Sequence, residues 1–248
     1  SGGSFIPPGT PFHYMIEVFD DAGAILRTDE KQVLYMDTRF EWSSVTKNQV
    51  TVHYYGPTES RAKTILEASN KTIEHMKDVL GIQYVDPINV VAYNNSRHMS
   101  SALPPKPAAI AEDLITEGQA WPDKRVVLVM AFPADVEGIG SHEITHVLVG
   151  DAAGIAYPMV PTWLNEGLAE YGNQTPSRSY EQALRYAIFT RKLKPLWFLN
   201  TFSGEPNDVI IAYGQSSSVV EFMIGQFGTG KIAELMIELQ NTLGIDDA

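Results

Sequence analysis

Cysteine is absent from the 248 residues, so the chain has no disulfide and no thiolate metal ligand, a composition that fits any compartment. Positive charge is scarce: 18 Lys and Arg stand against 30 Asp and Glu, a formal net charge of −12. This balance argues against nucleic acid or an anionic membrane as the main partner. No apolar run approaches the length of a transmembrane helix. With 44% hydrophobic residues, the chain can bury a full core in one or two domains.

Histidine is scarce too, yet two of the six histidines stand four residues apart in His142-Glu143-Ile144-Thr145-His146. On a helix, positions i and i+4 lie on one face, so both imidazoles can reach one metal ion. Apolar residues on both sides of the motif and Gly150 near its end favour a helix here. Glu143 follows the first histidine directly and points close to such a metal without having to bind it.

A carboxylate further along the chain supplies a third ligand. Glu166 lies in a segment that predicts a short helix over residues 161–171, with a proline at its start and Gly172-Asn173 at its end. Two His and one Glu leave the fourth position of a tetrahedral zinc open for water, which is the arrangement of catalytic sites. We therefore expect one Zn²⁺ ion on His142, His146 and Glu166. The alternative is an ordinary helix surface with a solvated Glu166.

The same residues resemble those of a known family. Nineteen residues separate His146 from Glu166, and Glu166 lies in the run Trp-Leu-Asn-Glu-Gly-Leu-Ala-Glu-Tyr. This pattern resembles the gluzincin metallopeptidases of the thermolysin and aminopeptidase clan, strongly over residues 136–172 and not before residue 120. Metzincin spacing is excluded, because Val149 and Ala152 occupy the positions of its Gly and His. The resemblance implies that His142, His146 and Glu166 bind zinc and that Glu143 is the general base. It also implies an extracellular or cell-envelope location.

Three further residues are candidates for supporting roles. Glu170 lies one helical turn after Glu166, and we expect it to accept the other ring N–H of His142. Hydrolysis also needs a donor for the oxyanion. Tyr213 is the first choice, since aminopeptidase-like relatives place a catalytic tyrosine just ahead of a similar helix. Tyr157 is the rival, because thermolysin-like enzymes have a tyrosine between their two ligand helices. The alternatives are a surface carboxylate for Glu170 and a packing role for each tyrosine.

The periodicities predict an α+β fold. Residues 1–56 are expected to be β-rich, as part of a β-sandwich or packed directly on the catalytic unit, and residues 57–248 to form a gluzincin-like domain. That domain would be zincin-like, with a small mixed sheet and the motif helix followed by a mostly helical C-terminal part. The expected elements are a helix from residue 58 to 80, strands at 88–93 and 125–130, a long loop over 94–124 that includes Pro104-Pro105-Lys106-Pro107, and helices at about 161–171, 177–192, 213–227 and 229–242.

The expected activity is hydrolysis of peptide bonds, most consistent with an endopeptidase. Aminopeptidase-like relatives hold the substrate amine with a Gly-Ala-Met-Glu-Asn type sequence ahead of the zinc helix. Residues 129–133, taken as the corresponding stretch, contain no glutamate. In similar enzymes, the strand beside the zinc helix is a sheet edge that pairs with substrate, and residues 125–130 are the candidate. The alternatives are an aminopeptidase, a zinc hydrolase of another bond, and a non-catalytic binding module that keeps the peptidase scaffold.

Overall fold

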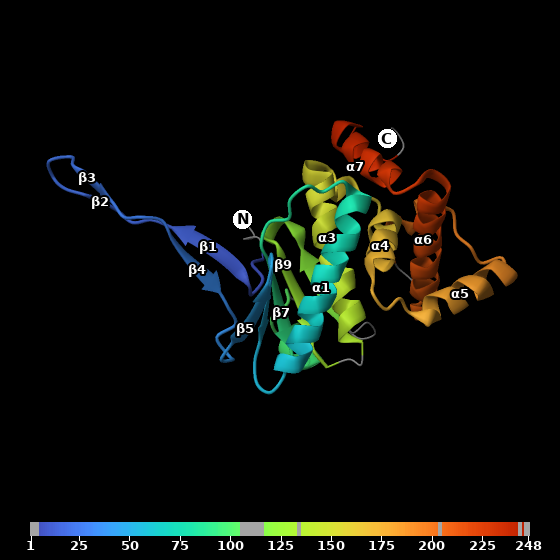
Figure 1. Cartoon of the computed structure of the whole chain (residues 1–248), viewed down its shortest axis with the longest axis horizontal. Coiled ribbons are helices and arrows are strands. Elements are labelled where there is room, and N and C mark those ends of the chain that lie inside the picture. The colour runs from blue at the N-terminus through green and yellow to red at the C-terminus, as the bar shows by residue number, and fades with distance from the viewer. Residues whose placement is uncertain (1–4, 105–116, 133–134, 203–204, 243–244, 246–248) are drawn as a thin grey trace.

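A five-stranded mixed sheet forms the centre of the protein in a computed structural model, which describes residues 5–104, 117–132, 135–202, 205–242 and 245 (Figure 1). Its strand order is β5-β6-β7-β9-β8. The β6, β7 and β9 strands run parallel, and both outer strands are antiparallel to their neighbours. The strands are β5 (Ser43–Lys47), β6 (Val50–Tyr54), β7 (Ile88–Tyr93), β8 (Gly118–Trp121) and β9 (Val126–Met130).

Two long helices, α1 (Glu59–Leu80) and α3 (Val136–Ala153), pack against each other and cover one face of the sheet. In α1, the apolar residues at helical spacing are all buried, and Gly81 ends the helix in the left-handed conformation with φ 70°. The other face of the sheet carries an aromatic cluster in which Phe40 stacks on Tyr55, beside the short helix α2 (Ser96–Ser100). The sheet is therefore buried on both sides, as its parallel centre requires.

The edge strand next to α3 is β8, and this corrects one expectation. The strand predicted at residues 125–130 is β9, but β9 lies inside the sheet, because β8 pairs with it from Gly118 opposite Val129 to Trp121 opposite Val126. The long loop expected over residues 94–124 therefore contains α2, β8 and the short 3₁₀ helix η1 (Pro122–Lys124). Residues 105–107 of its proline-rich stretch lie outside the described residues.

Residues 10–54 contribute to two separate parts of the fold, the central sheet and a ribbon of paired strands. Strands β5 and β6 join the central sheet, so the sheet crosses the boundary expected at residue 56. The preceding strands form two antiparallel pairs, β1 with β4 and β2 with β3, which extend away from the body as a ribbon (Figure 1). Its strands are β1 (Thr10–Tyr14), β2 (Glu17–Phe19), β3 (Ile25–Arg27) and β4 (Lys31–Tyr35). The sandwich expected for residues 1–56 stays a prediction.

The chain after residue 154 is mostly helical, as predicted, and the α+β fold class is confirmed. One helix differs from the expectation: α6 begins at Pro206, a residue suited to a first helical turn, seven residues before Tyr213. No helix among the described residues is both long and apolar enough to cross a membrane. The elements are η2 (Gly154–Met159), α4 (Thr162–Gly172), α5 (Arg178–Phe189), η3 (Leu196–Asn200), α6 (Pro206–Phe227) and α7 (Gly230–Thr242).

Candidate metal centre

Helix α3 places two imidazoles side by side. His142 and His146 are one helical turn apart, and their Nε2 atoms lie 3.2 Å from each other. Helix α4 brings Glu166 to the same point, where its Oε2 lies 3.2 Å from Nε2 of His142 and 3.6 Å from Nε2 of His146. Among the described residues, these three form the one group of at least three side chains whose ligand atoms could hold a metal ion.

The donor set fits a zinc ion. Bonds of about 2.1 Å at tetrahedral angles put two ligand atoms about 3.4 Å apart, and the three observed separations lie around that value. The Oε2 atom of Glu166 is buried and accepts no hydrogen bond from the described residues. A buried carboxylate oxygen without a partner is costly, and a cation at this point removes the cost. Two imidazoles and one carboxylate are also the ligand types of catalytic zinc sites.

Each imidazole is held by a hydrogen bond on its other nitrogen. His142 Nδ1 donates to Oε1 of Glu170 at 2.8 Å, and the Glu170 side chain is only 4% exposed. His146 Nδ1 donates to Oδ1 of Asn165 at 2.9 Å. With the protons on Nδ1, both Nε2 lone pairs face Glu166 and are available to a metal. The contact expected for Glu170 is present. Asn165 was not predicted, and its only signal in the sequence is its place directly before Glu166.

Glu143 is buried beside this group and carries a perturbed carboxyl. Burial raises the pKa of Glu143, and the imidazoles of His146 and His142 oppose that rise. The backbone of β8 passes very close to it: a Cβ on Gly118 would overlap the Glu143 side chain. Only glycine at residue 118 therefore lets the edge strand and the carboxylate approach each other in this way. Glu143 thus lies between the three ligand candidates and the free edge of the sheet.

Both tyrosine candidates line the same cavity, with different contacts. Burial raises the pKa of Glu166, but the imidazoles of His146 and His142 and the nearby hydroxyl of Tyr213 outweigh that and hold it below the usual range. The Tyr213 ring lies 6.2 Å from that of His142, and burial raises the pKa of its hydroxyl. Tyr157 instead accepts a hydrogen bond from Nδ2 of Asn165 at 3.3 Å.

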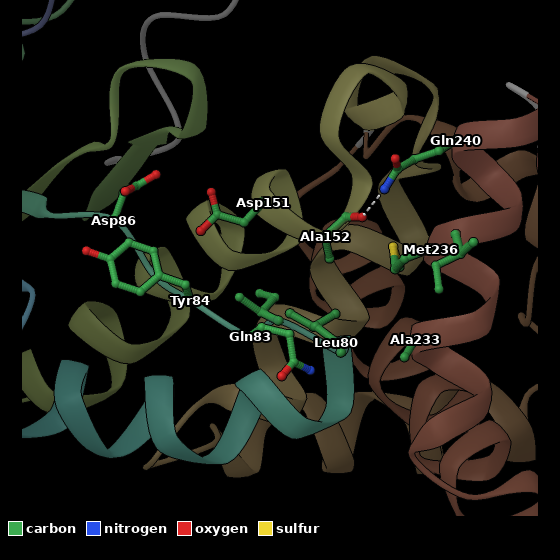
Figure 2. A pocket seen from close by; sticks show the side chains of 12 residues that line it. Leu80, Gln83, Tyr84, Asp86, Asp151, Ala152, Ala233, Met236 and Gln240 are labelled. Carbon is green, nitrogen blue, oxygen red and sulfur yellow. Dashed lines mark hydrogen bonds between the residues drawn. The ribbon is translucent and has the colours of Figure 1, made fainter.

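The cavity at the site has a volume of about 270 Å³ and opens along β8. A larger cavity of about 400 Å³ lies elsewhere, at the C-terminal ends of α1 and α3 beside α7 (Figure 2). Asp86 and Asp151 are its carboxylates, and Gln240 closes one side through a hydrogen bond to the carbonyl of Ala152. It contains no histidine. The smaller cavity is therefore the candidate site, and its lining residues are Gly118, Gln119, Ala120, His142, Glu143, His146, Tyr157, Asn165, Glu166 and Tyr213.

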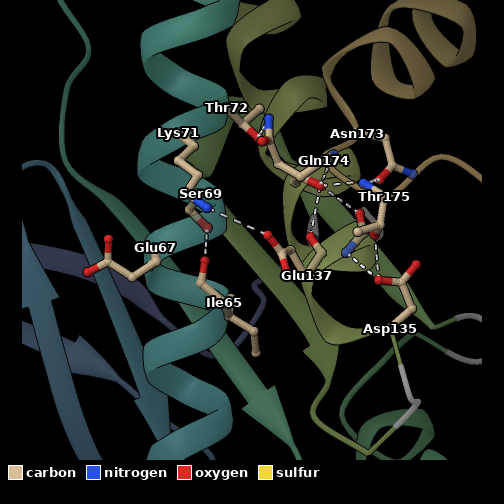
Figure 3. Close-up of polar contacts among 12 residues, drawn as sticks. Ile65, Glu67, Ser69, Lys71, Thr72, Asp135, Glu137, Asn173, Gln174 and Thr175 are labelled. Atoms are coloured by element: carbon tan, nitrogen blue, oxygen red, sulfur yellow. Dashed lines mark hydrogen bonds and ion pairs between the residues drawn. The ribbon is translucent and has the colours of Figure 1, made fainter.

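A polar network fixes the end of α4 against α1 and α3 (Figure 3). Thr72 of α1 donates to the carbonyl of Gly172 at 3.2 Å, and the backbone N–H of Gln174 donates to the hydroxyl of Ser141 at 3.0 Å. Thr175 donates to Asp135, the residue that caps the N-terminus of α3. Because Ser141 directly precedes His142, the network sets the two ligand-bearing helices in register.

The four remaining histidines stay outside the site. His75 stacks on Tyr171 with ring centroids 5.3 Å apart, and His53 bonds to Asn89 at 2.9 Å. His98 bonds to the hydroxyl of Tyr55 at 2.7 Å on the aromatic face of the sheet, and His13 pairs with Glu30 on the ribbon. Each has a structural partner away from the cavity, so none adds a ligand.

Comparison with known families agrees with the candidate metal site. The sequence model of the Peptidase MA superfamily matches residues 68–248, which is well over half of the chain. The chain therefore belongs to the Peptidase MA superfamily, and the resemblance drawn from residues 136–172 is confirmed. No curated protein matches the chain.

Proposed function

We propose that this protein is a zinc-dependent peptidase that cleaves internal peptide bonds. The observation that carries the proposal is one arrangement: three ligand atoms at tetrahedral spacing, with the buried carboxylate of Glu143 beside them, in a cavity at the free edge of the sheet. An edge strand offers unpaired N–H and C=O groups to an extended peptide, which favours a peptide or protein as substrate. An extracellular or cell-envelope location remains part of the proposal and rests on the family resemblance alone.

Each residue of the site has a separate role in the proposed hydrolysis. His142, His146 and Glu166 would hold the zinc, which when bound polarises the scissile carbonyl and lowers the pKa of water. Glu143 takes a proton from the attacking water and returns it to the leaving amine. Tyr213 donates a hydrogen bond to the oxyanion that develops on the carbonyl. Glu170 and Asn165 keep the two imidazoles in the tautomer that leaves Nε2 free.

The choice between internal and terminal cleavage depends on β8. Residues 129–133, which we compared with the amine-binding sequence of aminopeptidase-like relatives, belong to and follow the inner strand β9. The strand beside Glu143 is Gly118–Trp121, which also lacks a carboxylate, but the exposed Glu117 directly precedes it. A carboxylate there can bind a free amino terminus, so the aminopeptidase alternative has one residue in its favour.

Cleavage of one defined peptide in free and N-acetylated form separates the two activities. We expect both forms to be cut at the same internal bonds with similar kcat/KM, because an endopeptidase makes no use of the terminal amine. Glu117→Gln should change kcat/KM less than about threefold, as is usual for an exposed residue outside the chemistry. Stepwise release of single amino acids from the free peptide only, abolished by Glu117→Gln, would establish an aminopeptidase instead.

Metal content tests the proposal as a whole. We expect about one zinc per purified chain, loss of peptide cleavage after chelation, and recovery when one equivalent of zinc is returned. Magnesium is the matched control, because it prefers an octahedral set of oxygen ligands and should not restore cleavage. Zinc at one per chain without cleavage of any peptide in a diverse library would favour the non-catalytic module.

A further inference from the structure

Residues 178–198 carry a charge opposite to that of the whole chain. Five Lys or Arg and one Glu fall in this stretch, which gives it a formal net charge of +4 in a chain of −12. The stretch comprises α5, the turn after it and the first part of η3. In Figure 1, α5 lies at the end of the molecule opposite the ribbon. The net charge of the whole chain argues against an anionic partner, but it does not describe this stretch, where the local charge is positive.

Large apolar side chains are exposed in the same stretch. Helix α5 packs on α6 through the face that buries Ala187, and Phe189 on the opposite face is 89% exposed. Trp197 is 70% exposed and touches Phe198. It lies four residues after Leu193, so the chain keeps the two within about 14 Å of each other. We call the exposed side chains of this stretch the α5 surface; its apolar members are Tyr186, Ile188, Phe189, Leu193, Trp197 and Phe198.

The turn that ends α5 holds an arginine where glycine is the usual residue. Arg191 has φ 55°, and its N–H donates to the carbonyl of Ile188, while the N–H of Lys192 donates to that of Ala187. This is the Schellman ending of a helix, whose left-handed residue is most often glycine. In the described part of the chain, neither Arg191 nor Lys192 pairs with a carboxylate, and Nζ of Lys192 lies over the ring of Tyr186. Arg185 pairs with Glu181, and Lys194 pairs with Asp208. The backbone thus tolerates strain at Arg191, and two cations that pair with none of the described carboxylates follow Phe189 closely in the sequence.

We infer that the α5 surface docks on an anionic phospholipid bilayer, with Phe189 and Trp197 in the interface and Arg191 and Lys192 on the headgroups. Protruding aromatic and aliphatic side chains flanked by Lys and Arg are the composition of segments that lie in a membrane interface. The acidic ribbon of a second copy also has complementary charge. The ribbon and the α5 surface lie at opposite ends of the molecule, so this contact would have to join separate copies, and lipid-free self-association is one outcome of the test below.

Docking in this way also orients the candidate metal centre. Tyr180 of α5 stacks on Tyr213 with ring centroids 5.1 Å apart, so the helix that meets the bilayer contacts a residue that lines the cavity. Substrates close to the membrane surface would then be favoured over those in free solution. The inference does not depend on the peptidase proposal, because lipid binding is measured without turnover.

Vesicle flotation of the full chain tests the inference. Vesicles of phosphatidylcholine alone are compared with vesicles that also contain phosphatidylglycerol, at about 0.05 M and about 0.5 M NaCl, where screening differs strongly. We expect binding to the anionic vesicles at low salt, its loss at high salt, and little binding to phosphatidylcholine. Each cation near an anionic surface contributes about fivefold, so the double variant Arg191→Gly with Lys192→Gln should bind at least tenfold more weakly. Phe189→Ser should show a similar loss.

The controls separate docking from folding. Arg191→Gly suits the left-handed position, so the double variant should keep the wild-type Tm. Phe227→Ser and Lys231→Gln remove an exposed phenylalanine and a cation elsewhere and should bind like the wild type. Equal binding to both vesicle types, no binding to either, or wild-type binding by the α5 variants would each overturn the inference. Self-association in the absence of lipid, abolished by the same variants, would assign the surface to a second copy.

Discussion

Individual residues at the metal centre are fixed by neighbours that play no direct part in the chemistry. His142 is oriented by Glu170, and His146 by Asn165. The spacing of the motif and the helical offset between Glu166 and Glu170 were enough to predict the first contact. Asn165 could not be predicted, because its position relative to His146 depends on how α3 and α4 pack and not on any spacing within one helix. Sequence therefore locates the candidate ligands better than the groups that orient them.

Replacement of each tyrosine by phenylalanine distinguishes the two candidates for the oxyanion donor. Tyr213→Phe should lower kcat by about 10²–10³, the usual cost of removing one such donor. Tyr157→Phe should lower it less than about tenfold, because the described contact of the Tyr157 hydroxyl is with Asn165 and not with Glu166. The measurement is kcat and KM on one peptide, with zinc content as the control for an intact site. A larger fall in kcat for Tyr157→Phe than for Tyr213→Phe would reverse the assignment.

Elements were predicted well where periodicity was strong and poorly where it was weak. Helix α1 was placed within a residue or two by its apolar spacing and by Gly81. Strand β8 was missed, because the four residues Gly-Gln-Ala-Trp neither alternate clearly nor carry β-branched side chains. Its strand structure comes from pairing with β9, which is a tertiary effect. The start of α6 was missed because the sequence ahead of Tyr213 offered no apolar stripe that stood out.

Contact between α4 and α6 depends on a glycine in α4. A Cβ on Gly167 would overlap the carbonyl oxygen of Ser216 and the side chain of Val220. We therefore expect Gly167→Ala to lower the free energy of unfolding by about 1–3 kcal/mol, as overpacking does. Gly225→Ala in α6 is the matched control: it has open space and should gain up to about 1 kcal/mol from helix propensity.

Chemical denaturation of the two glycine variants gives both free energies. The comparison also bears on the site, because Gly167 directly follows Glu166. A forced separation of α4 from α6 should weaken zinc binding in Gly167→Ala and leave it unchanged in Gly225→Ala. If the two variants had equal stability, the close approach of these helices would not be a constraint on the fold.

At the scale of the whole molecule, the sequence predicted the α+β fold class but not which of the N-terminal strands join the central sheet. Residues 1–56 were expected to be β-rich, as part of a sandwich or packed on the catalytic unit, yet Phe19 and Leu26 of the ribbon are 64% and 69% exposed. Strand propensity does not tell whether a strand finds a partner sheet, so the ribbon could not be distinguished from part of a sandwich. For the same reason, β5 and β6 were assigned to the N-terminal segment although they belong to the central sheet.

The most direct test of the account compares Glu143→Gln with the wild-type chain. Glutamine has nearly the same size as glutamate but cannot accept the proton. Zinc content should therefore stay at about one per chain, while kcat falls by about 10²–10⁴-fold. His146→Ala, which removes a ligand, should lose both zinc and activity. Peptide cleavage by Glu143→Gln at the wild-type rate, with the same zinc content, would contradict the assignment of Glu143 as the base.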